Sequence, residues 1–165
     1  MTPTGLWSRI ALGSTLAVVL PLTLDIPPPT QLRASPALGL AVGLLAGTIL
    51  YGIVARRRPV AVGPAGPLPT AFIVGWATVE EIVWRWLLLG GLALAVPAAA
   101  AFVATIVAFA WAHAHGRRGH LLTGATFGGV YLFTGTLLAP VLAHVVYNLL
   151  VAGSLRTTRA QAQPG

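Results

Sequence analysis

Long apolar runs, separated by short breaks that contain arginine, are the feature that most limits how this chain can fold. A helix that crosses the hydrocarbon core of a bilayer needs roughly 20 mostly apolar residues. Six runs approach that length: residues 10–26, 37–55, 70–89, a fourth that follows Pro97 and ends at His115–Gly116, 121–136 and 138–155. The pattern predicts an all-α fold, a polytopic membrane helical bundle of about six transmembrane helices. We expect a turn between Gly90–Gly91 and Pro97, where glycine and proline interrupt the sequence.

The composition agrees with a membrane environment. Hydrophobic residues make up 56% of the chain and charged residues only 8%, whereas soluble proteins carry about 25% charged residues. The absence of cysteine excludes a disulfide scaffold and a cysteine-based metal or redox site. We therefore interpret residues 1–165 as a single integral membrane domain, with a polar C-terminal tail at 156–165. No small-x-small cleavage site precedes Pro27, so we expect the first run to remain as a helix.

The net charge of +7 comes from arginines that lie in clusters between the apolar runs. A nucleic-acid-binding protein would gather them on one soluble face, so we expect membrane lipids around this chain and no nucleic acid. With six spans, both termini lie on the same side of the membrane. Arg33 falls on the opposite side, whereas eight arginines fall on the side of the termini: Arg9, Arg56, Arg57, Arg58, Arg117, Arg118, Arg156 and Arg159. The positive-inside rule then predicts cytoplasmic termini, N-in and C-in. The lysine-free, arginine-rich composition suggests a bacterial cytoplasmic membrane protein.

Two adjacent carboxylates inside the third run are the strongest functional signal. A charge at the bilayer centre costs about 2.5–3.5 kcal/mol on insertion scales, yet Glu80, Glu81 and Arg85 lie within six residues of each other. Neighbours on a helix point about 100° apart, whereas Glu81 and Arg85 are spaced i,i+4 and can form an ion pair. Glu80 must then find a partner on another helix or take up a proton.

Polar side chains in the fourth and sixth runs supply candidate partners. His113 follows Phe109 by one helical turn, so the imidazole and the phenyl ring share a face. His144 and Asn148 are related in the same way and present two polar groups toward one place. We expect these side chains to converge with Glu80 in a cavity that opens to the cytoplasm.

The two remaining histidines are assigned to a loop. His115 and His120 flank Arg117 and Arg118 between the fourth and fifth runs. Because that segment is polar and lies on the predicted cytoplasmic side, we expect both imidazoles to be solvated.

The residue types suggest hydrolysis with water as the nucleophile, because no cysteine or serine accompanies them. Glu80 could accept the proton of a water that His113 positions. His144 and Asn148 could donate hydrogen bonds to the oxyanion of a tetrahedral intermediate. A zinc site with Glu80, His113 and His144 as ligands is the alternative. We favour the metal-free mechanism, with no cofactor, because the chain has no H-E-x-x-H spacing.

These residues also resemble a known family. Three motifs in order, inside apolar runs, are similar to those of the CPBP intramembrane endopeptidases, which comprise the type II CAAX prenyl proteases and the bacteriocin-processing Abi relatives: Glu80-Glu81-x-x-x-Arg85, Phe109-x-x-x-His113 and His144-x-x-x-Asn148. The resemblance covers a motif-bearing core of about residues 70–153. It implies an intramembrane endopeptidase that acts on a peptide or protein substrate, which is lipidated in the type II CAAX proteases.

The resemblance also implies a role for each residue. Glu80 would activate the water, His113 would position it, and His144 with Asn148 would form the oxyanion hole. The supporting residues would be Glu81, Arg85 and Phe109. The family does not decide between the metal-free and the zinc mechanism.

Two other functions fit parts of the pattern. A non-catalytic immunity or scaffold protein of the membrane could keep the same fold and motifs. A small transporter or proton relay would also place ionisable side chains in the membrane, although the chain has no inverted repeat.

The arginine distribution yields a testable topology. A reporter fused at Gly165 should be cytoplasmic, and one inserted between Pro27 and Pro36 should lie on the opposite side. Paired fusions with a cytoplasm-active and a periplasm-active reporter measure both positions. An extracytoplasmic C-terminus would contradict the six-span topology.

Overall fold

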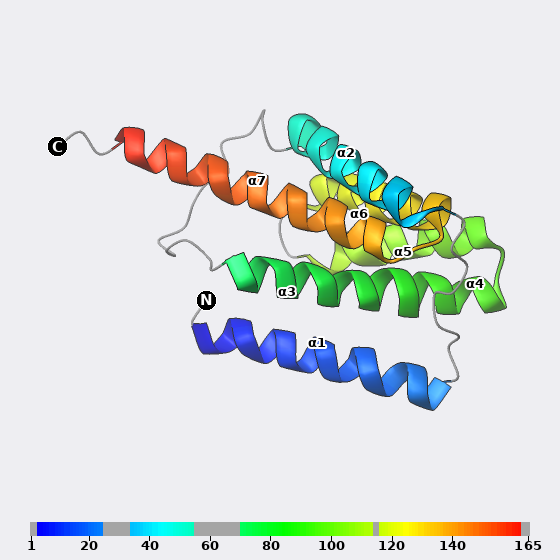
Figure 1. Cartoon of the computed structure of the whole chain (residues 1–165). Coiled ribbons are helices and arrows are strands. Elements are labelled where there is room, and N and C mark those ends of the chain that lie inside the picture. Colours follow the sequence, from blue (N-terminus) through cyan, green and yellow to red (C-terminus); the bar gives the residue numbers. More distant parts are fainter. Residues whose placement is uncertain (1–2, 25–33, 55–69, 114–115, 163–165) are drawn as a thin grey trace.

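The computed structural model of the chain describes residues 3–24, 34–54, 70–113 and 116–162, and almost all of these residues are helical (Figure 1). Helix α3 runs directly into the π-helix η1 and then into α4, because the residues at both junctions keep right-handed helical dihedral angles. The described residues therefore make six helical rods and no strand, as the sequence predicts. The elements are α1 (Pro3–Leu24), α2 (Pro36–Val54), α3 (Thr70–Glu81), η1 (Ile82–Gly90), α4 (Gly91–Ala95), α5 (Ala98–Ala112), α6 (Arg117–Thr134) and α7 (Leu138–Ala162).

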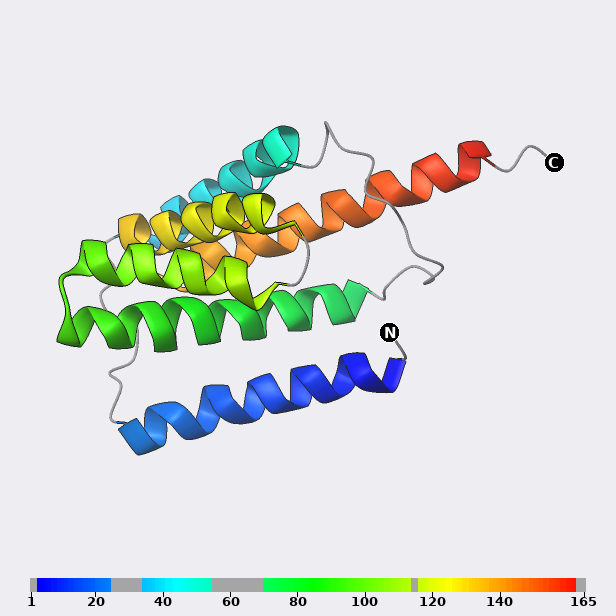
Figure 2. The same cartoon turned by 180° about the vertical axis from the view of Figure 1, so that it is seen from behind.

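The rods alternate in direction along the chain. The start of α1, the start of α3 and the end of α7 lie at one end of the bundle, and the view from behind shows the start of α6 at that end too (Figure 2). An even number of alternating rods returns the chain to its starting side. The sidedness of the bundle in a membrane stays a prediction.

The surface is apolar and the interior holds charge, which is the reverse of a soluble protein. Leu45, Ile53 and Trp111 are more than half exposed, whereas Glu81 and Arg85 are buried. Within the described residues, α2 alone is long and apolar enough to cross a bilayer by length and composition, and shorter apolar stretches occupy Ile10–Thr23, Ala98–Ala112 and Leu138–Ser154.

Helix α2 packs closely against α7 through a stripe of glycines. Gly39, Gly43 and Gly47 recur every four residues, and all three are buried. A Cβ atom at Gly43 would lie 2.6 Å from the carbonyl oxygen of Ala139, and one at Gly47 would overlap the carbonyl oxygen of Ala143. Small residues let helix backbones approach closely in apolar surroundings. The closest approach of α2 to the α7 backbone is therefore at Ala143, the residue that precedes His144.

The chain turns within the predicted stretch between Gly90–Gly91 and Pro97, but only at its far end, so the third helix is longer than expected. The helix continues through both glycines to Ala95, and the chain turns at Val96, whose backbone is extended, before Pro97. In an apolar medium each backbone N–H and C=O must be bonded internally, so two glycines alone do not end a helix. Proline, which has no N–H to donate, marks the start of α5.

Two other boundaries differ from the sequence analysis. Helix α6 begins at Arg117 rather than at residue 121 and ends at Thr134, before Gly135, whose φ of 64° is left-handed. Helix α7 continues to Ala162, into the segment predicted as a polar tail. The Pro27–Pro29 segment lies outside the described residues.

The glycine stripe can be tested by one substitution made at two positions of α2. Gly47→Ala should destabilise the protein by about 1–3 kcal/mol, the usual cost of overpacking, because the new methyl group meets the α7 backbone. Gly52→Ala is the matched control, since a Cβ there meets nothing within 4 Å. Thermal unfolding in detergent measures both variants. Equal unfolding temperatures would contradict the close contact of α2 with α7.

Candidate active site

A buried ion pair lies at the junction of α3 and η1. Glu81 Oε2 is 3.0 Å from Arg85 Nε, and the two side chains are 0% and 1% exposed. This confirms the i,i+4 pair that the sequence predicts. The Arg85 guanidinium carbon also lies 5.1 Å from the ring centroid of Phe109 and 5.9 Å from that of Phe127. These rings and the carboxylate together compensate the charge of a cation that is removed from water.

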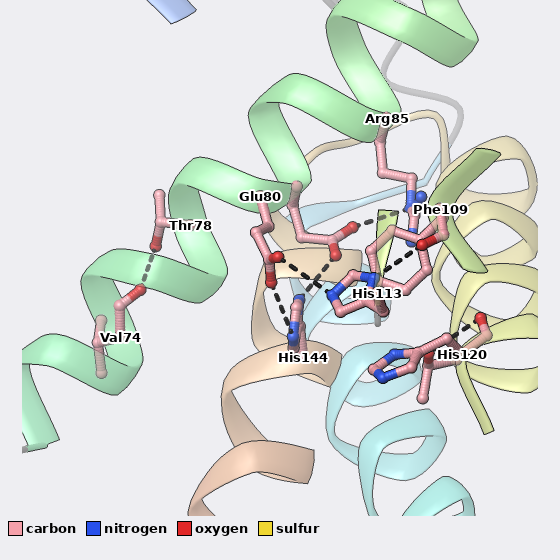
Figure 3. A network of polar contacts seen from close by, with 10 residues as sticks. Val74, Thr78, Glu80, Arg85, Phe109, His113, His120 and His144 are labelled. Carbon is pink, nitrogen blue, oxygen red and sulfur yellow. Dashed lines mark hydrogen bonds and ion pairs between the residues drawn. The ribbon is translucent and has the colours of Figure 1, made fainter. Parts of the chain in front are cut away.

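The second oxygen of Glu81 has a partner that the helical spacing did not reveal. Glu81 Oε1 is 2.8 Å from Nδ1 of His144 on α7 (Figure 3). Because Glu81 is paired with a permanent cation, it is an ionised acceptor and His144 Nδ1 carries the hydrogen. The His144 ring is also stacked on Phe127, with 4.6 Å between the centroids. These contacts turn His144 Nε2 toward Glu80.

Glu80 lies between two imidazoles from other helices. Its Oε1 is 3.6 Å from His113 Nε2, and its Oε2 is 3.6 Å from His144 Nε2. Its side chain is 11% exposed, so it reaches the edge of the cavity described below. These distances are too long for direct hydrogen bonds. The expected partners of Glu80 on other helices are thus present. Each imidazole is far enough from the carboxylate for a small molecule such as water to bond to both groups.

His113 lies at the point where α5 ends. Its backbone is extended, with φ −102° and ψ 117°, and its Nδ1–H donates to the carbonyl oxygen of Phe109 at 2.7 Å. The two rings share a face, as predicted, with 4.6 Å between their centroids. Phe109 itself is buried and meets Trp84 edge to face. When the ring is neutral, the hydrogen on Nδ1 leaves Nε2 as an acceptor that faces Glu80.

A cavity of about 190 Å³ joins these groups. Four helices supply its walls, and the lining residues are Trp76, Glu80, Phe109, His113, His120, Thr123, Phe127, His144, Tyr147 and Asn148. The structure therefore brings all four predicted catalytic residues to one cavity. Their chemical roles stay predictions.

His120 is placed differently from the sequence analysis. It belongs to the first turn of α6, is half-buried, and stacks on His113 with 3.9 Å between ring centroids and 19° between ring planes. The prediction of a solvated loop residue is wrong, because α6 starts four residues earlier than its apolar run and turns this side chain inward. The sequence signal for this position was that His120 directly precedes the apolar run 121–136, so that a helix starting one turn earlier would include it. His115 lies outside the described residues.

Two imidazoles and a carboxylate, all of them possible metal ligands, lie around the cavity. Among the described residues, no group of three or more His, Cys, Asp or Glu side chains is arranged to hold one. Each imidazole Nε2 faces a different oxygen of Glu80, so the carboxylate separates the two rings instead of sharing a common centre with them. We therefore derive no step through a metal, and the metal-free mechanism stays a proposal.

Comparison with known proteins identifies a family. The family model described as type II CAAX prenyl endopeptidase Rce1-like matches residues 61–150, which is more than half of the chain and includes all three motifs. No curated protein and no solved structure matches the chain.

The two adjacent carboxylates should differ in their effect on folding. Glu81→Gln leaves a buried guanidinium without its counter-charge and should cost about 3–5 kcal/mol, as is usual for a broken buried pair. Glu80→Gln should unfold close to the wild-type temperature, because the nearest partners of Glu80 are 3.6 Å away. Thermal unfolding of both variants in one detergent compares them. A Glu80→Gln variant that is the less stable of the two would reverse this assignment.

Proposed function

Because the chain belongs to the type II CAAX prenyl endopeptidase Rce1-like family, whose members are integral membrane proteases, we propose that it is an intramembrane endopeptidase in which Glu80 activates the attacking water. The observation that carries this proposal is the position of Glu80, at the edge of a polar cavity between two imidazoles that approach it without bonding to it directly.

The spacing of Glu80 and His113 suits a bridging water. Two atoms 3.6 Å apart can both be reached from one water at ordinary hydrogen-bond distances. Such a water donates one hydrogen to the carboxylate of Glu80 and the other to the bare Nε2 of His113. Its oxygen lone pairs then face the cavity, where a substrate carbonyl would lie.

The proton follows a closed path in this mechanism. Glu80 accepts a proton from the water as the water oxygen bonds to the carbonyl carbon. The C–N bond of the tetrahedral intermediate then breaks, and Glu80 returns the proton to the departing amine nitrogen. One water is consumed, one peptide bond is broken, and the carboxylate of Glu80 is regenerated.

His144 and Asn148 are suited to the oxyanion that forms during attack. With Nδ1 committed to Glu81, His144 becomes a donor at Nε2 when the ring is protonated, and Asn148 lines the same cavity one helical turn later. One donor aimed at an oxyanion is worth about 3–4 kcal/mol of barrier. Glu81 in this account is a positioning residue, since it acts through His144.

A second, larger hollow suggests the kind of substrate. A groove of about 450 Å³ shares Trp76, Glu80 and His113 with the polar cavity and is otherwise lined by Leu12, Gly13, Leu16, Val79, Val83, Trp84 and Ala112. Its walls are mostly apolar and come from α1, α3, η1 and α5. Because the apolar groove adjoins the polar cavity, a peptide could place a lipidated or strongly hydrophobic segment in the groove and its scissile bond in the cavity. We place the cleavage near the cytoplasmic face of a bacterial cytoplasmic membrane, on the side that the arginine clusters predict.

The proposal predicts cleavage that depends on Glu80. Purified protein in liposomes should hydrolyse members of a library of lipidated and hydrophobic peptides, read by mass spectrometry. Glu80→Gln should lower kcat by about 10²–10⁴, the usual contribution of a general base, and His144→Ala by about 10²–10³. Thr78→Val is the control on α3, because its hydroxyl donates to the Val74 carbonyl within the helix, away from the histidines (Figure 3).

Each other outcome points to a different function. Cleavage that survives in both site variants indicates a contaminating protease, and absence of cleavage favours the immunity or scaffold protein. Movement of protons or solute with peptides left intact favours a transporter. Activity should also persist in strong chelators. Stoichiometric zinc, with activity lost on chelation and restored by zinc, would contradict the metal-free mechanism and make Glu80, His113 and His144 the ligands.

A further inference from the structure

His120 contacts the catalytic histidine through the face of its ring. Its ring covers a face of the His113 ring at 3.9 Å and 19°. It also lies 5.9 Å from the Phe109 ring at a steep angle of 65°. The three rings form one cluster at the junction of α5 and α6, beside the polar cavity that His120 helps to line (Figure 3).

The position of His113 explains why it needs such support. It caps α5 with an extended backbone, so the helix does not set the direction of its side chain. The hydrogen bond from Nδ1 to the Phe109 carbonyl fixes the direction in which Nδ1 points. The ring plane can still rotate about the line of that bond. A flat side chain stacked on the ring face removes this freedom.

We propose that His120 is a positioning residue for the hydrolysis proposed above: its stacked ring holds the plane of His113, so that Nε2 stays directed at the water beside Glu80. The inference rests on that proposed function. It assigns the contribution of His120 to its aromatic face rather than to a proton that it carries.

The test compares two substitutions at one position. His120→Ala removes the stacked face and should lower kcat on the order of 10- to 100-fold, the scale of small misplacements of a catalytic group, with KM changed little. His120→Phe keeps the face without a nitrogen and should retain kcat within a few-fold of wild type. Leu122→Ala, at an exposed position of the same helix, controls for disturbance of α6. His120→Leu replaces the alanine variant if the latter does not fold.

A measurement without turnover follows the stack itself. In histidine-labelled protein, with resonances assigned by single substitutions, the ring protons of His113 should show an upfield ring-current shift. The part of this shift that His120 causes should be lost in His120→Ala and kept in His120→Phe. The part caused by Phe109, whose ring centroid is 4.6 Å from that of His113, should remain in both variants. The same spectra can be recorded in the Glu80→Gln background, where cleavage is expected to be about 10²–10⁴ times slower.

The outcomes separate this inference from the proposed function. A wild-type protein that cleaves no peptide refutes the hydrolysis and, with it, the catalytic consequence of the stack. An active wild-type enzyme with an unimpaired His120→Ala variant overturns the positioning role alone. Equal losses of kcat in His120→Ala and His120→Phe would also overturn it, because they would show that a nitrogen of His120 is required.

Discussion

The carboxylate of Glu81, shared between Arg85 and His144, is the interaction on which the rest of the site depends. One oxygen neutralises a guanidinium that is 1% exposed, and the other holds a histidine from a helix more than 60 residues later in the chain. A charge in apolar surroundings is tolerated only when it is paired and bonded. The pair therefore ties the α3–η1 junction to α7, and it fixes which nitrogen of His144 faces the cavity.

The neighbouring carboxylate, that of Glu80, takes no part in the ion pair with Arg85. Because adjacent helix residues diverge by about 100°, Glu80 turns away from Arg85 and toward the cavity, where it meets two imidazoles at 3.6 Å. Helix α7, which carries His144, packs closely against the glycine stripe of α2, and the ring of His113 stacks on that of His120. Two identical side chains in sequence thus have separate roles, one structural and one proposed as catalytic, through helical geometry alone.

Much of this arrangement could be predicted from periodicity, and the exceptions have physical causes. The spacing of Glu81 with Arg85 gave a correct contact, because neighbours on one helix are fixed by its repeat. Phe109 also contacts His113, although the backbone of His113 is extended at the end of α5. The bond between Glu81 and His144 joins different helices, and no local pattern encodes it. The π-helical turn after Glu81 and the inward position of His120 depend on packing. The third helix continues past its predicted end at residue 89, because an apolar environment favours continued helix through Gly90 and Gly91.

A single turnover in water labelled with heavy oxygen tests the central claim most directly. With enzyme in excess over a cleaved peptide, direct attack by a water that Glu80 activates places one labelled oxygen in the new C-terminal carboxylate of the product and none in Glu80. Mass spectrometry of the product and of the enzyme peptide containing Glu80 reads both sites. Label in the carboxylate of Glu80 would show that this residue attacks the substrate itself, and unlabelled product would show that water is not the nucleophile; either result would contradict the account.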